Sequence, residues 1–159
     1  MSEKNNAQLP IPRGDYVAAR RYDNLIMSAG MTPRQNGELL YKGRIRKCDS
    51  IEQYEEAVQL ACANALNAVL SNIKSDEELA CILHLIVYIN ADAEFEAHSR
   101  IADLASAYLK ARIGDAGVAS RAAIGVASLP GNAPVEIQIT GAIRKINVNS
   151  FPISPNSSS

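Results

Sequence analysis

An alternation of apolar and polar residues runs through Ser120–Ile143, which has the sequence SRAAIGVASLPGNAPVEIQITGAI. A period of two is typical of β-strands, because successive side chains of a strand point to opposite faces. The tetrapeptide Leu-Pro-Gly-Asn at positions 129–132 interrupts the alternation and is typical of a turn. The pattern therefore predicts two strands joined by this turn.

The two predicted strands carry a cation and a carboxylate at defined positions. Branched apolar residues share one face of each strand, and Arg121 and Glu136 fall on the opposite faces. If the two branched faces cover one core, Arg121 and Glu136 lie together on the other side of the sheet. Small residues such as Gly125 accompany them there and leave room for a ligand. We therefore predict a ligand-binding face that contains this pair.

The rest of the chain divides into segments of recognisable periodicity. Apolar residues recur at helical spacing in two long segments, and Ser50 and Gln53 form a capping-box pattern at the start of the first. The segment LACILHLIVYIN is apolar on both faces, which is typical of a central strand. The additional elements predicted are strands at Tyr16–Tyr22, Leu25–Ala29 and Leu79–Asn90 and helices at Ile51–Ile73 and Glu94–Arg112.

This order of elements favours an α+β fold. Two helices with one apolar stripe each can cover a single face of a mixed sheet. The other face stays open in a monomer, although Leu79–Asn90 is apolar on both sides. Since an exposed apolar face of this extent usually marks an interface, we expect a homo-oligomer with Arg121 and Glu136 at or near the contact.

Composition and charge narrow the class of protein. A length of 159 residues predicts one domain. The net charge of −1 predicts no overall electrostatic field that would attract nucleic acid or an anionic membrane. We expect this domain at 1–145 and a disordered Ser/Pro-rich tail at 146–159. The sequence has no apolar run of membrane-spanning length, and its polar start is no signal peptide. Three widely spaced cysteines indicate reduced thiols and a cytoplasmic location.

Other polar groups are interpreted as structural. The basic loop Lys42–Lys47 is interpreted as solvated rather than phosphate-binding, because aromatic residues hardly interleave with its charges. His84, inside the central strand, is interpreted as a hydrogen-bonded core or interface histidine. His84 and His98 lack metal-ligand spacing, so we predict no metal site.

The stretch Arg121–Ile137, with the sequence RAAIGVASLPGNAPVEI, resembles the signature of the YjgF/Rid family. These are reactive-intermediate imine deaminases, also described as L-PSP endoribonucleases, whose pattern is Arg, a strand, Leu-Pro, a short turn and Val-Glu-Ile. The resemblance covers residues 16–143 and is closest to a YjgF-like subgroup without a firmly defined substrate. Further matching pieces, in the family's order, are Tyr16-Val17, LIMSAG at 25–30, the helix with Asn64, and Val-Tyr-Ile at 87–89 followed by Phe95.

This resemblance implies a chorismate-mutase-like α+β fold, assembled as a homotrimer with ligand sites in clefts between subunits. It implies hydrolysis of enamines or imines of amino acids, as by 2-iminobutanoate/2-iminopropanoate deaminases, to 2-keto acids and ammonia without metal or organic cofactor. By the same resemblance Arg121 grips the substrate carboxylate, Glu136 positions and deprotonates a water, and Tyr16 closes over the ligand. The remaining substrate-binding positions that it implies are Gly30, Ser99 and Ala123.

Three positions depart from the pattern of many active members. Ala29 replaces a serine, Ser99 an asparagine and Ala123 a cysteine, and each change removes a polar contact to the substrate. Two alternatives therefore stay open: a non-catalytic trimer that binds a small carboxylate metabolite, and an endoribonuclease or translation inhibitor. The purely structural interpretation is an Arg121–Glu136 ion pair that fixes the trimer contact.

Overall fold

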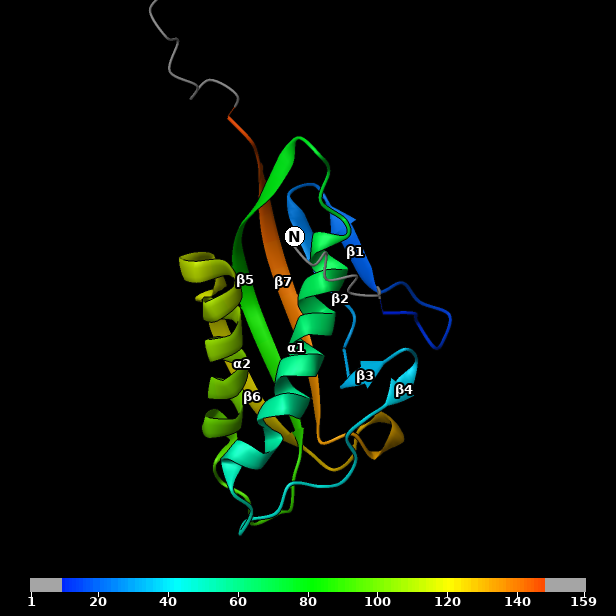
Figure 1. Cartoon of the computed structure of the whole chain (residues 1–159), viewed down its shortest axis with the longest axis vertical. Coiled ribbons are helices and arrows are strands. Elements are labelled where there is room, and N and C mark those ends of the chain that lie inside the picture. The colour runs from blue at the N-terminus through cyan, green and yellow to red at the C-terminus, as the bar shows by residue number, and fades with distance from the viewer. Residues whose placement is uncertain (1–9, 148–159) are drawn as a thin grey trace, which may run out of the picture.

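Two helices cover one face of a five-stranded mixed sheet in the computed structural model, which describes residues 10–147 (Figure 1). The strands are β1 (Ala19–Tyr22), β2 (Leu25–Ser28), β3 (Arg34–Gln35), β4 (Glu38–Leu39), β5 (Glu77–Asn90), β6 (Ser120–Val126) and β7 (Val135–Lys145). The helices are α1 (Glu55–Leu70) and α2 (His98–Ile113). The sheet has the order β1-β2-β7-β5-β6, in which only the β5–β6 pair is parallel among the described strands.

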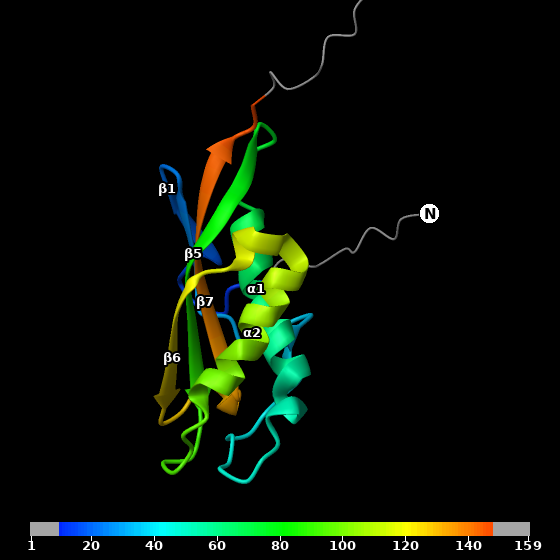
Figure 2. The ribbon, with the colours of Figure 1, turned by 90° about the vertical axis from the view of Figure 1, so that its left-hand side faces the viewer.

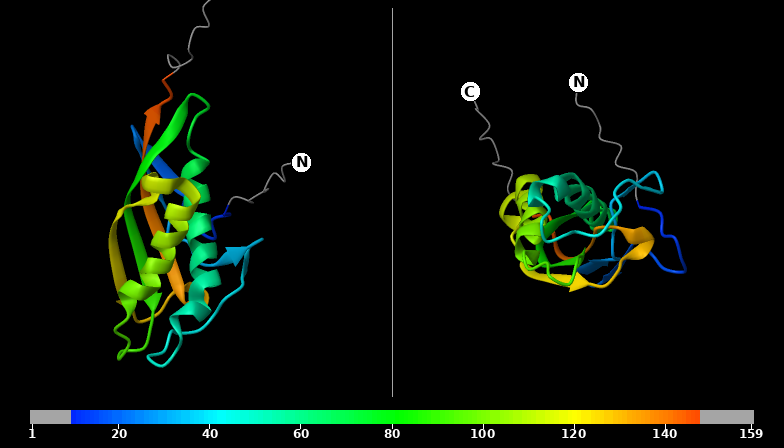
Figure 3. Two further views of the ribbon diagram at one scale, coloured as in Figure 1. Left: turned by 60° about the vertical axis from the view of Figure 1, so that its left-hand side comes forward. Right: turned by 90° about the horizontal axis from the view of Figure 1, so that it is seen from below.

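The core lies between the sheet and the helix layer. Figures 2 and 3 show α1 and α2 together on one side of the sheet. Branched side chains fill the space between the layers, and Val87, Ile89, Ile137 and Ile139 have no exposed surface. This packing confirms the predicted α+β architecture, because two apolar stripes are enough to cover one face of the sheet.

The two C-terminal strands lie where the alternation predicts them, but they are not neighbours in the sheet. Both pair with β5, one on each side. The connection through α2 returns β6 parallel to β5, as a crossover helix does, and the turn at Pro130–Asn132 then carries the chain past β5 to β7. The strand that is apolar on both faces therefore takes an interior position between β7 and β6, while β7 is the central strand.

The first long helix begins later than predicted. A short 3₁₀ turn at Ile51–Tyr54 precedes α1, and Ser50 makes no side-chain cap. The Ser50 hydroxyl instead donates to Glu52 Oε2 at 3.1 Å, so the predicted capping box with Gln53 is wrong. Helix α2 also starts later than predicted, at His98.

A small β3–β4 hairpin occupies part of the long segment that follows β2. Its turn residues Asn36 and Gly37 have φ angles of 52° and 80°, as a two-residue type I′ turn requires. The Asn64 side chain of α1 donates to the Thr32 carbonyl at 3.1 Å and to the Arg34 carbonyl at 2.8 Å. Helix α1 therefore holds this hairpin in place.

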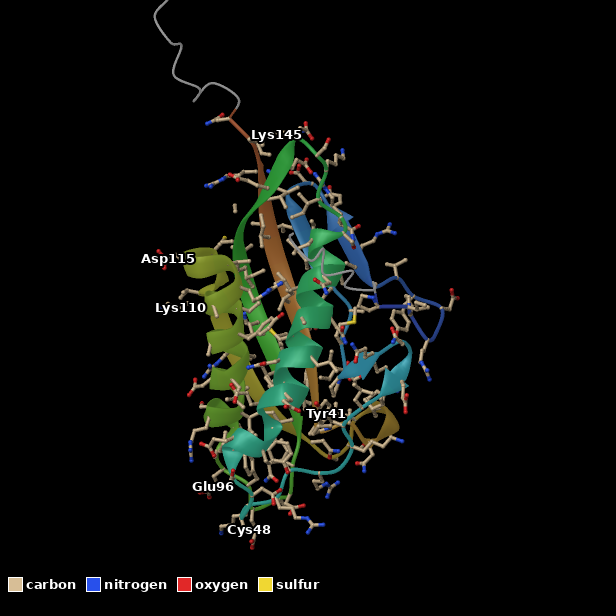
Figure 4. All side chains as sticks on the ribbon, viewed as in Figure 1. Tyr41, Cys48, Glu96, Lys110, Asp115 and Lys145 are labelled. Atoms are coloured by element: carbon tan, nitrogen blue, oxygen red, sulfur yellow. The ribbon has the colours of Figure 1, made fainter. Side chains whose placement is uncertain are left out.

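A buried carboxylate closes the end of the sheet that lies away from this hairpin. Glu77 is 8% exposed and accepts two hydrogen bonds from Arg21, at 2.6 and 2.9 Å. Lys145, labelled at this end in Figure 4, lies 3.6 Å from Glu77 and 2.5 Å from Asp76. The Arg21 hydrogen bonds, followed by the Lys74 backbone N–H, lower the pKa of Glu77 to about 2.

Replacing Glu77 with glutamine is expected to lower the melting temperature at pH 7, by roughly 5 °C. The folded-state pKa of about 2 lies below the ordinary value of 4.5. The stabilisation by Glu77 is therefore complete above about pH 4.5 and is lost as the pH falls towards 2. Thermal unfolding of both proteins across this range checks the prediction.

The matched control for this prediction is Glu78→Gln. Glu78 pairs with Arg144 at 2.7 Å, but both side chains are largely solvent-exposed. Its loss is expected to change the melting temperature by no more than about 2 °C. Equal effects of the two substitutions, or a Glu77→Gln effect that persists at pH 2, would contradict the assignment.

Two expectations concern the chain as a whole. Within residues 10–147, neither helix is long and apolar enough to cross a membrane. The predicted tail at 146–159 lies outside the described residues from position 148 onward.

Cys62 is buried beneath α2, and burial raises the pKa of its thiol to about 12, so this thiol stays protonated at neutral pH.

Candidate functional site

A half-buried carboxylate, Glu136, lies at the centre of the candidate site. It belongs to β7 and points away from the helices, since its neighbours Val135 and Ile137 are fully buried on the helix side. A Cβ atom at Gly30 would lie 1.8 Å from Glu136 Oε1. Any other residue at position 30 would therefore displace the carboxylate. Burial raises the pKa of Glu136 above its ordinary value.

Glu136 and Gly30 line an open cleft of about 1690 Å³. The segment before β1 contributes Tyr16, whose side chain is 53% exposed, and α1 contributes Asn64. Pockets for single small molecules measure about 300–1,000 Å³. The cleft is therefore larger than one amino-acid-sized ligand requires.

Arg121 lies on the other side of the sheet. Its guanidinium donates to Asp103 Oδ1 at 2.7 Å and to Ser106 Oγ at 3.0 Å, and both acceptors belong to α2. Arg121 thus faces the helix layer, whereas Glu136 faces away from it. The prediction that these two residues share a face of one protomer is wrong, and they form no ion pair within residues 10–147.

The error has a steric cause. Helix α2 packs closely on the small residues of β6, and a Cβ atom at Gly125 would lie 2.4 Å from His98 Nε2. Ala123 packs against the same core. The branched residue Ile124 is left on the outer face, where it is 40% exposed. On this edge strand the small residues face the core, which reverses the expected assignment of faces.

The six predicted site residues therefore form two separate groups. The carbonyl of Ser99 accepts a 3.4 Å hydrogen bond from Arg121, so Ser99 lies beside the arginine. Tyr16, Gly30 and Glu136 line the cleft, whereas Arg121, Ser99 and Ala123 lie between β6 and α2. One protomer thus holds two half-sites on opposite sides of its sheet.

Three further arginines, which no pattern in the sequence singles out, line the cleft: Arg13, Arg20 and Arg34. The Asn-Gly pair at 36–37 is a hairpin signal, and it could have placed Arg34 beside a tight turn. Arg13 belongs to an irregular segment, where periodicity gives no information about the direction of a side chain.

The other polar groups singled out in the sequence have structural partners. Arg44 of the basic loop donates to Asn90 Oδ1 at 3.3 Å and to the Ala127 carbonyl at 2.5 Å. His84 Nδ1 lies 2.9 Å from the hydroxyl of Ser120. The Arg44 contacts attach the basic loop to the end of the sheet, and the Ser120 hydroxyl gives the His84 ring nitrogen a hydrogen-bond partner.

The fold and the cleft define a small α+β protein. Its half-buried carboxylate lies on the uncovered side of the sheet, in space left free by a glycine. The family model described as Endoribonuclease L-PSP matches residues 6–143. The chain belongs to this family, which confirms the resemblance found in its sequence. A comparison with curated proteins finds no match.

Solved structures with the same fold include proteins from three bacteria. Atu1372 from Agrobacterium tumefaciens, of unknown function, is 27% identical with a TM-score of 0.74, over 86% of each chain. A Shewanella oneidensis protein described as a "putative endoribonuclease" is 24% identical with a TM-score of 0.73, over 85% of this chain and 89% of that one. Escherichia coli TdcF with bound serine is 18% identical with a TM-score of 0.63, over 87% and 95%.

Proposed function

We propose that the protein hydrolyses imines or enamines of amino acids to 2-oxo acids and ammonia. The observation that carries this proposal is the half-buried Glu136 carboxylate, which faces a cleft across the space that Gly30 leaves free. Burial raises the pKa of this carboxylate, which makes it a stronger base. The serine bound in the TdcF structure supports an amino-acid-sized ligand for this fold.

The proposed site combines two protomers of a homotrimer. Because Arg121 and Glu136 face opposite sides of one sheet, a neighbouring protomer supplies the arginine. Strand β6 lies at the edge of the sheet and the Arg121 side chain is 23% exposed, so its guanidinium is accessible from outside. The uncovered sheet face carries exposed apolar side chains that support such an interface: Tyr22, Leu25, Met27 and Ile124.

Each residue of the proposed site has one task. Arg121 of the neighbour holds the substrate carboxylate through two parallel hydrogen bonds. Glu136 takes a proton from a water molecule while the water oxygen bonds to the imine carbon. The proton passes to the imine nitrogen, which gives a carbinolamine. The hydroxyl proton of this intermediate then moves to the same nitrogen, so that ammonia leaves as the C–N bond breaks and the C=O bond of the 2-oxo acid forms. Tyr16 covers the ligand from the rim of the cleft.

A coupled assay tests the proposal. An amino-acid oxidase generates a panel of 2-imino acids, and semicarbazide traps the imine that remains. Wild-type protein is expected to lower the trapped imine, and Arg121→Ala to lose about 100-fold of this activity or more, because the substrate carboxylate loses its two hydrogen bonds. An unchanged rate in Arg121→Ala would overturn the assignment, as would a wild-type protein that is inactive on the whole panel.

Ribonuclease activity is the second candidate, and the description of the matching family model favours it. A nuclease holds RNA through its phosphates, so its affinity must fall steeply as salt rises. Arg44 of the basic loop already donates hydrogen bonds to Asn90 and Ala127, so fewer of its N–H groups are free to bind phosphate. Cleavage of RNA at physiological salt, lost in Glu136→Gln, would support this candidate.

A carboxylate-binding protein without turnover is the third candidate. Ala29, Ser99 and Ala123 replace polar or nucleophilic residues of many active members, which favours it. This candidate requires saturable binding of 2-oxo acids together with inactivity on the whole imine panel.

A further inference from the structure

Two arginines converge on one carbonyl oxygen in the wall of the cleft. Arg34 Nη1 donates to the Gly37 carbonyl at 3.3 Å, and Arg13 Nη2 donates to the same oxygen. Two nitrogen atoms that share one acceptor lie within roughly 6 Å of each other. One arginine comes from the segment before β1 and the other from β3, so the fold brings the two cations together.

These two cations have no carboxylate partner within residues 10–147. The ion pairs of the described chain include neither Arg13 nor Arg34. The cleft itself contains Asp15 and Glu136 as carboxylates, against three arginines when Arg20 is included. A carbonyl oxygen offsets only a small part of the repulsion between two guanidinium groups, whereas an anion that bridges them attracts both and forms stronger, charge-assisted hydrogen bonds.

The arginine pair and Glu136 line the same cleft, so one ligand can contact both. Arg34 Nη2 lies 3.3 Å from the place of a Cβ atom at Gly131, beside Pro130 in the same cleft wall. The cleft of about 1690 Å³ has space beyond that of a three- or four-carbon imino acid. A ligand whose reacting carbon lies at Glu136 can therefore extend a second group towards the arginines.

We propose that Arg13 and Arg34 form a subsite for a second anionic group, carboxylate or phosphate, on the substrate. This inference rests on the proposed function and names its substrate class: 2-imino acids with an acidic side chain. Planar guanidinium groups suit both anions, because each presents parallel N–H donors. Arg34 and Arg13 are specificity-determining residues, and the reaction itself stays with Glu136 and the neighbour's arginine.

The test measures binding of the stable 2-oxo acid products by calorimetry. 2-Oxoglutarate and 2-oxopentanoate have the same chain length and differ only in the terminal carboxylate. Phosphohydroxypyruvate ends in a phosphate and distinguishes that anion from the carboxylate. Wild-type protein is expected to bind at least one of the two ligands with a second anionic group at least about tenfold more tightly than 2-oxopentanoate.

Substitutions of the two arginines test whether they cause this preference. Arg13→Gln and Arg34→Gln are expected to abolish most of the tenfold preference while 2-oxopentanoate binds as before, which also shows that the variants are folded. Arg34→Lys keeps the charge without the planar fork and is expected to retain part of the preference. The control Arg112→Gln removes an equal charge from the exposed end of α2 and is expected to retain all of it.

Equal binding of all three ligands by wild-type protein would overturn the subsite, and so would a preference that survives in both glutamine variants. Absence of any binding would overturn it as well. The proposed function is decided separately by imine hydrolysis. Activity on 2-imino acids with neutral side chains, lost in Arg121→Ala, therefore upholds the function even if the subsite fails.

Discussion

Replacing Glu136 with glutamine is expected to lower the rate of imine hydrolysis by about 100- to 10,000-fold, since an amide cannot take a proton from water. Glutamine has nearly the same shape and fills the same space against Gly30, so the fold and the binding of 2-oxo acids are expected to persist. The coupled imine assay measures the rate, and calorimetry measures the binding. A variant with more than about a tenth of the wild-type rate would rule out Glu136 as the base.

The pH profile of the wild-type protein in the imine assay provides a second measurement of the same residue. Burial raises the pKa of Glu136 above its ordinary value of 4.5. The base must be ionised, so activity is expected to fall as the pH drops through this raised pKa. The control Asp15→Asn removes an exposed carboxylate from the same cleft and is expected to leave the rate within about twofold of wild type.

Mixed trimers of two inactive variants are expected to regain activity. If each site takes Arg121 from one protomer and Glu136 from the next, an Arg121→Ala protomer still supplies an intact Glu136 half-site. A Glu136→Gln protomer likewise supplies an intact arginine. In a cyclic trimer assembled at random from equal amounts, about one quarter of the sites contain both intact halves. Co-expressed variants with different tags should therefore recover about one quarter of the wild-type rate.

The alternative geometry gives the opposite result. If both residues acted within one protomer, every site in the mixed trimers would lack one of them and the rate would stay near zero. The control pairs Arg121→Ala with the double variant Arg121→Ala/Glu136→Gln, which leaves no intact arginine in any site. Recovery in that control would show that Arg121 is not required.

Much of the fold could be predicted from the sequence, because its signals are local. The segment that became β5 is apolar on both faces and was predicted as a central strand; it is an interior strand, although β7 is the central one. Two helices with one apolar stripe each predicted one covered face of the sheet. The β3–β4 hairpin was missed, since strands of two residues are too short for a period to appear. The 3₁₀ turn at Ile51–Tyr54 was also missed, because Ser50 and Gln53 match a capping box that does not form.

The site could be predicted only in part, because its assembly depends on packing between distant segments. Tyr16, Gly30 and Glu136 do line one cleft. The face of Arg121 was assigned from the branched residues of its strand, but close packing of α2 requires small residues there and reverses the faces. The subsite arginine Arg13 depends on the path of an irregular segment, which no sequence period describes.

The attachment of the hairpin to α1 also affects the stability of the cleft wall. Strands of two residues are not stable by themselves, and the two hydrogen bonds from Asn64 hold the hairpin against the helix. We therefore expect this wall to open at a lower free energy than the core sheet. An anion that bridges Arg34 to the rest of the cleft stabilises the closed wall. Ligand affinity and hairpin order would then be linked reciprocally, so a substitution that removes the hydrogen bond from Asn64 to Arg34 is expected to change affinity through the order of this wall.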